Sequence, residues 1–70
     1  MDRQKILNDF GFNFKMERMR QKLTQDDIVE KTDFSKAYIS NVENGRHDLS
    51  MVNALILARV LGKTIEELIG

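Results

Sequence analysis

The sequence contains no cysteine and no proline, and its single histidine is His47. The absence of cysteine excludes disulfide bonds, thiolate metal sites and cysteine nucleophiles together. One histidine cannot build a metal cluster by itself, so we expect no metal site and interpret His47 as a loop residue rather than a phosphate contact. A glycine-rich phosphate loop is also lacking, and the acidic residues mostly suit helix caps or the surface. We therefore predict neither an enzyme nor a cofactor.

The sequence also lacks long apolar runs and an excess of charge of either sign. No run approaches the roughly 18 residues of a membrane span, and the first ten residues do not resemble a signal peptide, so we expect a cytoplasmic protein without membrane contact. Lys and Arg number 11, as do Asp and Glu, so the net charge is zero. This balance argues against tight non-specific binding of nucleic acid, but it does not exclude a small basic face.

The chain has 70 residues, of which 41% are apolar and 31% charged, as is typical of one soluble helical domain. A domain of this size buries only about 60% of its unfolded surface. Without disulfides or metal, dense helix packing or association has to stabilise it.

Helix-start signals divide the chain into short helices. A serine or threonine that can cap a helix stands before each of four apolar patterns. The expected helices cover about residues 25–31, 36–44, 51–61 and 65–69, after the caps Thr24, Ser35, Ser50 and Thr64.

Ile6, Phe10 and Phe14 lie four residues apart, which is the spacing of one helix face. This spacing predicts a helix from about residue 10 to 22. Residues 1–9 form either an extension of it or an N-terminal arm, and a basic arm could reach into a minor groove. Residues 10–70 are expected to form the helical core of a single domain.

Arg18 shares the apolar stripe of the first helix with Phe14. A buried arginine needs a carboxylate, because an unpaired charge is costly in the interior. Glu43, at the end of the helix over residues 36–44, is the natural partner. We predict a structural ion pair between Arg18 and Glu43.

Residues 24–46 are the centre of the pattern. Two short helical segments meet at Asp33, where the chain must turn sharply, and aspartate tolerates the left-handed backbone conformation better than most residues. The second segment turns short side chains outward, and a helix that is apolar behind and polar in front is suited to recognition. These outward residues are Lys36, Ala37, Ser40 and Asn41.

The arrangement resembles the Cro/C1-type helix-turn-helix family of phage repressors and bacterial regulators, also called the XRE family. The resemblance runs from about Gly11 to Leu68. It implies an all-α fold, a compact lambda-repressor-like bundle of five short helices in which the second and third form the helix-turn-helix. Its markers are Arg18, Leu23 to Gln25, Ile28, Ser35, Tyr38 to Ser40, Val42 to Gly45, Ser50, Ala58, Leu61, Gly62 and Thr64 to Leu68.

The resemblance implies that the helix from Ser35 to Glu43 lies in the major groove of double-stranded DNA. Position by position, the base-reading residues would be Ser35, Lys36, Ala37, Ser40 and Asn41. The phosphate contacts would be Gln25, Tyr38, Asn44 and Arg46, with Tyr38 equally interpretable as a packing residue.

Three residues depart from the family pattern. Asp33 stands where members usually have glycine, Val29 where they have alanine, and Leu49 where proline is common. None of these changes removes a required donor, but Asp33 places negative charge near the reading helix.

Residues and resemblance together predict a sequence-specific transcriptional regulator, a repressor or controller, that binds a palindromic operator as a homodimer without an evident small-molecule ligand. The alternative is a helix-turn-helix-shaped protein-interaction module without DNA binding. The helix over residues 51–61 is apolar on most faces, so one side of it should meet a second subunit. The expected dimer surface comprises Leu55, Leu57, Val60, Ile65 and Ile69.

Overall fold

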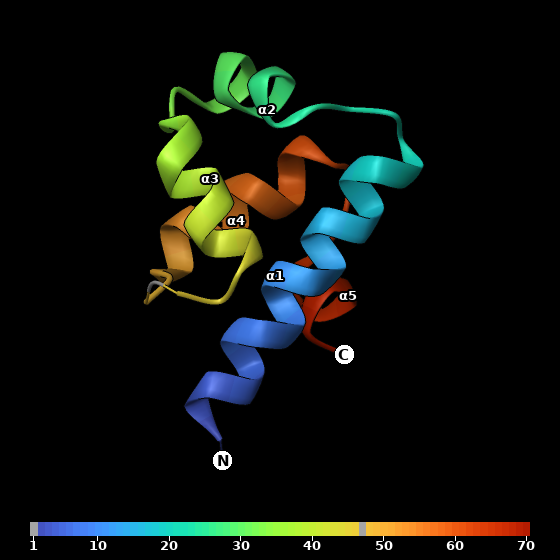
Figure 1. The fold of residues 1–70 in the computed structure, drawn as a ribbon. Coiled ribbons are helices and arrows are strands. Elements are labelled where there is room, and N and C mark those ends of the chain that lie inside the picture. Colours follow the sequence, from blue (N-terminus) through green and yellow to red (C-terminus); the bar gives the residue numbers. More distant parts are fainter. Residues whose placement is uncertain (1, 47) are drawn as a thin grey trace.

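The computed structural model describes residues 2–46 and 48–70, and within these residues it contains five helices and no strand. They are α1 (Arg3–Arg20), α2 (Gln25–Thr32), α3 (Lys36–Glu43), α4 (Met51–Val60) and α5 (Ile65–Ile69). α1 packs against α3 and α5, α2 packs against α3 and α4, and α4 packs against α5 (Figure 1). The expected all-α bundle of five short helices is confirmed. Within the described residues, no helix is both long and apolar enough to cross a membrane.

Each of the four predicted caps is in place. The side chains of Thr24, Ser35, Ser50 and Thr64 each accept a hydrogen bond from the backbone N–H three residues further on. Asp27 and Glu67 complete capping boxes by accepting from the backbone N–H of Thr24 and Thr64. These backbone hydrogen bonds stabilise the charged carboxylates and lower the pKa of both. Local chemistry therefore sets where these helices begin.

Three helices, α1, α3 and α4, end in the same way, with a left-handed residue two positions after the last helical residue. These residues are Lys22, Gly45 and Gly62, with φ of 61°, 67° and 72°. After α1, Lys22 N–H donates to the carbonyl of Met19 at 2.9 Å and Leu23 N–H to that of Arg18 at 3.0 Å, which is the Schellman pattern. Glycine adopts this conformation without steric cost, whereas lysine is strained in it.

α1 differs from the helix expected over residues 10–22. It begins at Arg3, capped by the Asp2 carboxylate, and ends at Arg20. Residues 3–9 are therefore a helical extension, and the arm interpretation is wrong. Gly11 lies within α1 and does not interrupt it. Its role is close packing, because a Cβ there would lie 2.1 Å from the Val42 carbonyl oxygen. The glycine lets α1 approach the end of α3.

The core is formed by one side of every helix. Its fully buried large side chains are Phe14, Ile28, Ile39 and Leu57. Leu57 is 0% exposed, so the prediction that it belongs to a dimer surface is wrong. α4 is apolar on most faces, and its sequence could not indicate which face turns inward. The buried core residues are Phe10, Phe14, Ile28, Ile39, Val42, Ala54, Leu57, Ala58, Leu61 and Leu68.

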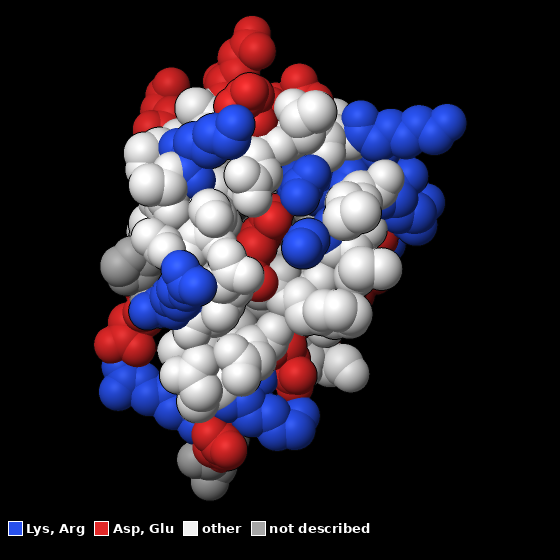
Figure 2. Space-filling model, viewed as in Figure 1, with Lys and Arg blue, Asp and Glu red and all other residues white. Residues whose placement is uncertain are grey.

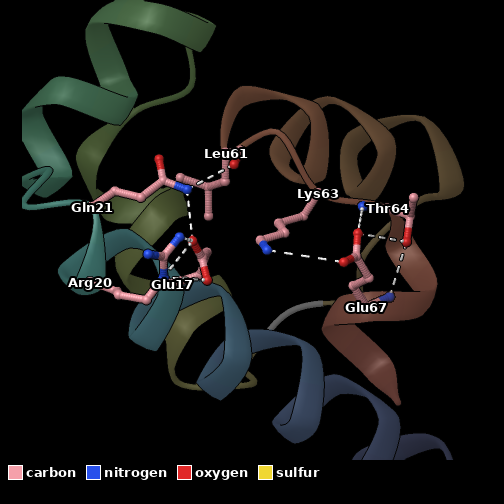
Figure 3. A network of polar contacts seen from close by, with 7 residues as sticks. All are labelled: Glu17, Arg20, Gln21, Leu61, Lys63, Thr64 and Glu67. Carbon is pink, nitrogen blue, oxygen red and sulfur yellow. Dashed lines mark hydrogen bonds and ion pairs between the residues drawn. The ribbon is translucent and has the colours of Figure 1, made fainter.

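A polar network ties the end of α1 to the turn between α4 and α5 (Figure 3). The Glu17 carboxylate accepts from Arg20 Nε at 3.0 Å and from Gln21 Nε2 at 2.8 Å. Gln21 Nε2 also donates to the Leu61 carbonyl at 2.8 Å. The hydrogen bonds from Arg20, and next from Gln21, lower the pKa of Glu17 to about 2. The network fixes the turn from which α5 starts.

Candidate nucleic-acid interface

α2 and α3 are joined by a short turn centred on Asp33. Asp33 is left-handed, with φ of 66°, as predicted, and its N–H donates to the Val29 carbonyl at 2.9 Å. The Thr32 hydroxyl donates to the Ile28 carbonyl at 2.6 Å and accepts from Phe34 N–H at 3.2 Å. Backbone and side chain together set the angle at which α3 leaves α2.

The inner side of α3 is held by apolar contacts. Ile39 and Val42 are 0% and 3% exposed. The rings of Phe34 and Tyr38 lie 4.9 Å apart between centroids, and both residues pack against the core. These contacts leave the opposite side of α3 facing outward.

The predicted ion pair between Arg18 and Glu43 is confirmed, and it belongs to a larger network. Arg18 Nε and Nη2 donate to the two carboxylate oxygens of Glu43 at 2.7 and 3.2 Å. Arg18 Nη1 donates to the Leu23 carbonyl at 2.7 Å, and Gln25 Nε2 donates to Glu43 Oε1 at 3.0 Å. The side chains of Arg18 and Glu43 are only 10% and 3% exposed. The network fixes the end of α3 against α1 and the start of α2.

The five residues expected to read bases lie at the start and on the outer side of α3. Ser35, Lys36 and Ala37 are exposed, whereas Ser40 and Asn41 are half-buried. Residues 36 and 40, and likewise 37 and 41, are four apart and therefore neighbours on one helix face. The fold thus presents these side chains together, on a helix that is anchored from behind.

The residues expected to contact phosphate have different surroundings. Asn44 and Arg46 are exposed directly after α3. Gln25 is the first residue of α2, and its side-chain amide bonds to Glu43, a use that the sequence did not indicate. The Tyr38 hydroxyl accepts from Asn53 Nδ2 at 3.0 Å. This bond supports the packing interpretation of Tyr38.

The helical extension of α1 supports the segment that follows α3. Gln4 Nε2 donates to the Gly45 carbonyl at 2.8 Å and to Asn8 Oδ1 at 2.9 Å, and Arg3 forms an ion pair with Asp48. The contacts of Gln4 with Gly45 and of Arg3 with Asp48 were not predicted, because they join residues 41 and 45 positions apart. The interpretation of His47 concerns a residue outside the described part of the chain.

Charge on this face is mixed. Figure 2 shows separate Lys and Arg side chains over the face that carries α3, and acidic side chains gathered at the top of the view, over α2. One ion pair joins the two helices: Lys36 Nζ lies 3.3 Å from Asp26 Oδ1. In the described residues, no group of three or more His, Asp or Glu side chains is placed to hold a metal ion.

Two short helices joined by a tight turn, with the second anchored behind and polar in front, define a helix-turn-helix protein. A model of the helix-turn-helix family matches residues 14–68. The chain belongs to this family, in its Cro/C1 or XRE type, and is a DNA-binding transcriptional regulator.

Two sequence relatives lie close in length. The uncharacterized HTH-type transcriptional regulator y4dJ of Sinorhizobium fredii is 33% identical over 69 residues, which are 99% of this chain and 86% of that protein. The control protein C.MunI of a Mycoplasma species is 31% identical over 67 residues, covering 89% of this chain and 90% of that protein.

Two solved structures share the fold. The restriction-modification controller protein C.AhdI of Aeromonas hydrophila has a TM-score of 0.81 at 31% identity, covering 89% of this chain and 94% of its own. The hypothetical transcription factor NHTF from Neisseria has a TM-score of 0.87 at 21% identity, covering 100% and 80% of the two chains. Because the identity is only 21%, the second match shows that the fold is shared and nothing more.

Proposed function

We propose that the protein acts as a homodimer that occupies a palindromic operator, with the outer side of α3 reading bases in the major groove. The observation that carries this proposal is the outer side of α3 itself, where short polar side chains stand on a helix fixed by the Arg18–Glu43 network. Two of the relatives described above are named as control or controller proteins. Their names support a regulatory role for this protein.

Each outward residue has a chemical role in this proposal. Asn41 pairs with adenine through its amide, Lys36 donates to guanine O6 or N7, and Ala37 contacts a thymine methyl group. Ser35 and Ser40 hydroxyls complete the reading surface. Two copies of α3 would enter successive major grooves about 34 Å apart.

Phosphate contacts come from the ends of the two helices. Arg46 and Asn44 follow α3, and Gln25 opens α2, whose N-terminal N–H groups favour an anion. Tyr38, which is half-buried, would reach phosphate only with the edge that its packing leaves accessible. With about four phosphates neutralised per subunit, binding should fall with salt at a log–log slope of about −7 for the dimer.

The dimer surface in this proposal lies on α4 and α5. Met51 and Val52 are 75% and 65% exposed, and Leu55, Ile56 and Ile69 are also exposed. A groove between the helices is lined by Met51, Leu55, Ile65 and Ile69 with charged residues around it. Such an apolar surface suits a two-fold interface, in which each copy offers the same patch. Compared with the dimer surface predicted from the sequence, this surface also includes Met51, Val52 and Ile56, and it no longer includes Leu57. Val60 and Ile65 are half-buried and contribute only their accessible edges.

Selection of sites from random duplexes tests DNA reading. Asn41→Ala should lower affinity at one base pair by about 1–3 kcal/mol, whereas Arg46→Ala should weaken binding to all duplexes alike. Fluorescence anisotropy with the selected site and its single-pair variants measures both effects. If no duplex is enriched, the protein-interaction alternative replaces this proposal.

Sedimentation tests the dimer separately. Val52→Asp places a charge in the proposed interface and should produce a monomer at micromolar concentration. Phe12→Asp is the matched control, because Phe12 is a comparably exposed apolar residue, 60% exposed, on α1 and not among the residues of the proposed interface. A wild-type protein that sediments as a monomer at that concentration would overturn the dimer.

A further inference from the structure

The ion pair between Asp26 and Lys36 spans the two helices of the helix-turn-helix at its exposed face, with Asp26 Oδ1 3.3 Å from Lys36 Nζ. We infer that Asp26 is a specificity-determining residue: it holds the Lys36 ammonium over the base edges and keeps it from phosphate. This inference rests on the proposed function, in which Lys36 reads a base.

The pair joins two well-anchored positions. Asp26 is the second residue of α2, and Lys36 is the first residue of α3. The capping box holds the start of α2, and the Ser35 cap holds the start of α3. The backbone positions of the two residues are therefore fixed relative to each other, so the short Asp26 side chain can orient the longer lysine side chain.

Folding does not account for the pair. The side chains of Lys36 and Asp26 are 62% and 74% exposed. Exposed pairs of this kind contribute little to stability, since water and salt screen them. Asp27, the next residue, already completes the capping box of α2. The pair is better explained by what it does to Lys36 on the DNA-facing surface.

The chemistry of the ammonium supports this role. Lysine has three N–H donors and no acceptor, so one donor can remain on Asp26 while the others reach guanine O6 and N7. Without Asp26, Lys36 is a flexible point charge that phosphates attract in any sequence. The Asp26 charge also repels phosphate directly, by about threefold in affinity per subunit at about 7 Å in water-like surroundings.

Asp26→Asn should therefore change affinity and specificity in opposite directions. Affinity for an unrelated duplex should rise about tenfold for the dimer, which is the threefold effect applied in two subunits. The log–log salt slope should steepen by about 0.9 per subunit, because Lys36 gains a phosphate. Discrimination at the base pair that Lys36 reads should fall about tenfold, within the range of one specific contact.

The experiment compares wild type, D26N, K36A and the double variant by fluorescence anisotropy between about 50 and 200 mM salt, a range in which phosphate contacts dominate the response. The duplexes are the selected site, its single-pair variants and an unrelated sequence. D33N is the matched control: it removes the same charge from the other end of the α2 segment, at a left-handed position that asparagine also tolerates. Circular dichroism verifies that every variant is folded.

The inference holds if D26N loses discrimination at the pair that K36A identifies, while D33N retains it and the double variant is no worse than K36A alone. It is overturned if D26N discriminates as wild type does, if D33N has the same effect, or if the two losses add. A K36A variant with unchanged discrimination also overturns it, yet leaves the rest of the proposed function standing. Failure to select any site is a failure of the proposed function itself.

Discussion

Replacing Arg18 with methionine tests whether the buried ion pair fixes the reading helix. The substitution keeps an unbranched side chain but removes the charge and three hydrogen bonds, two to Glu43 and one to the Leu23 carbonyl. Among the hydrogen bonds of the described residues given above, Glu43, whose side chain is 3% exposed, would then keep the one from Gln25. A buried charge without its counter-ion is strongly destabilising.

The expected loss is about 3–5 kcal/mol in the free energy of unfolding, the usual cost of breaking a buried pair from one side. A domain of this size has a total stability of roughly 4–10 kcal/mol, so the single variant should lose a third or more of it. Arg18→Met combined with Glu43→Leu removes both charges. The Leu23 carbonyl and the Gln25 amide lose these hydrogen-bond partners, which should lower the free energy of unfolding by about 1–2 kcal/mol in total. The double variant should therefore be more stable than Arg18→Met alone.

Urea denaturation followed by circular dichroism measures these differences. Protein concentration has to be equal for all variants, because dimerisation stabilises the folded state by mass action. With a slope near 1 kcal/mol per molar urea, the single variant should unfold about 3–5 M earlier than wild type, or be unfolded in buffer. Two results refute the reasoning: a single-variant loss below about 1 kcal/mol, or a double-variant loss equal to the sum of the two single losses.

Three other substitutions test separate features of the fold by the same measurement. Glu17→Gln should lower the free energy of unfolding at pH 7. Because the folded-state pKa of Glu17 is lowered to about 2, this difference in stability from wild type should persist down to about pH 4.5 and vanish as the pH falls to about 2. A difference in stability that does not depend on pH would contradict this. Gly11→Ala should destabilise the fold by about 1–3 kcal/mol, because the added Cβ would lie 2.1 Å from the Val42 carbonyl oxygen. This loss should exceed the gain from alanine being the better helix former. A stabilised variant would show that α1 and α3 are further apart. Lys22→Gly should stabilise by about 0.5–1 kcal/mol, because relief of the left-handed backbone at φ 61°, about 1–2 kcal/mol, exceeds the entropic cost of glycine, about 0.5–1 kcal/mol. An earlier urea midpoint would exclude that strain.

Much of the helix-turn-helix was predictable because its determinants are local. Ser and Thr caps act on backbone N–H groups three residues away, and a left-handed turn requires particular residues at one position. Asp33 is the clearest case, since its place between two apolar patterns predicted a sharp left-handed turn, and the structure has φ of 66° there. The pair between Arg18 and Glu43 was also predictable, because a charge on an apolar stripe requires an opposite charge.

Other features depended on contacts that no local pattern contains. The extension of α1 packs on the segment after α3 through Gln4 and Gly45, which are 41 residues apart. Gln25 bonds to Glu43, and Asp26 pairs with Lys36, only because α2 and α3 are held at one angle.

By itself, the sequence determined where most helices begin and end and that one of them turns polar side chains away from the core. Capping and turn preferences act within a few residues, so they can be predicted from the sequence without knowledge of the fold. The tertiary structure decided which face of α4 is buried, since that helix is apolar on most sides and packing alone placed Leu57 inside and Val52 outside. It also decided that Lys36 is held by Asp26, because a contact between two helices exists only once both have docked on the core.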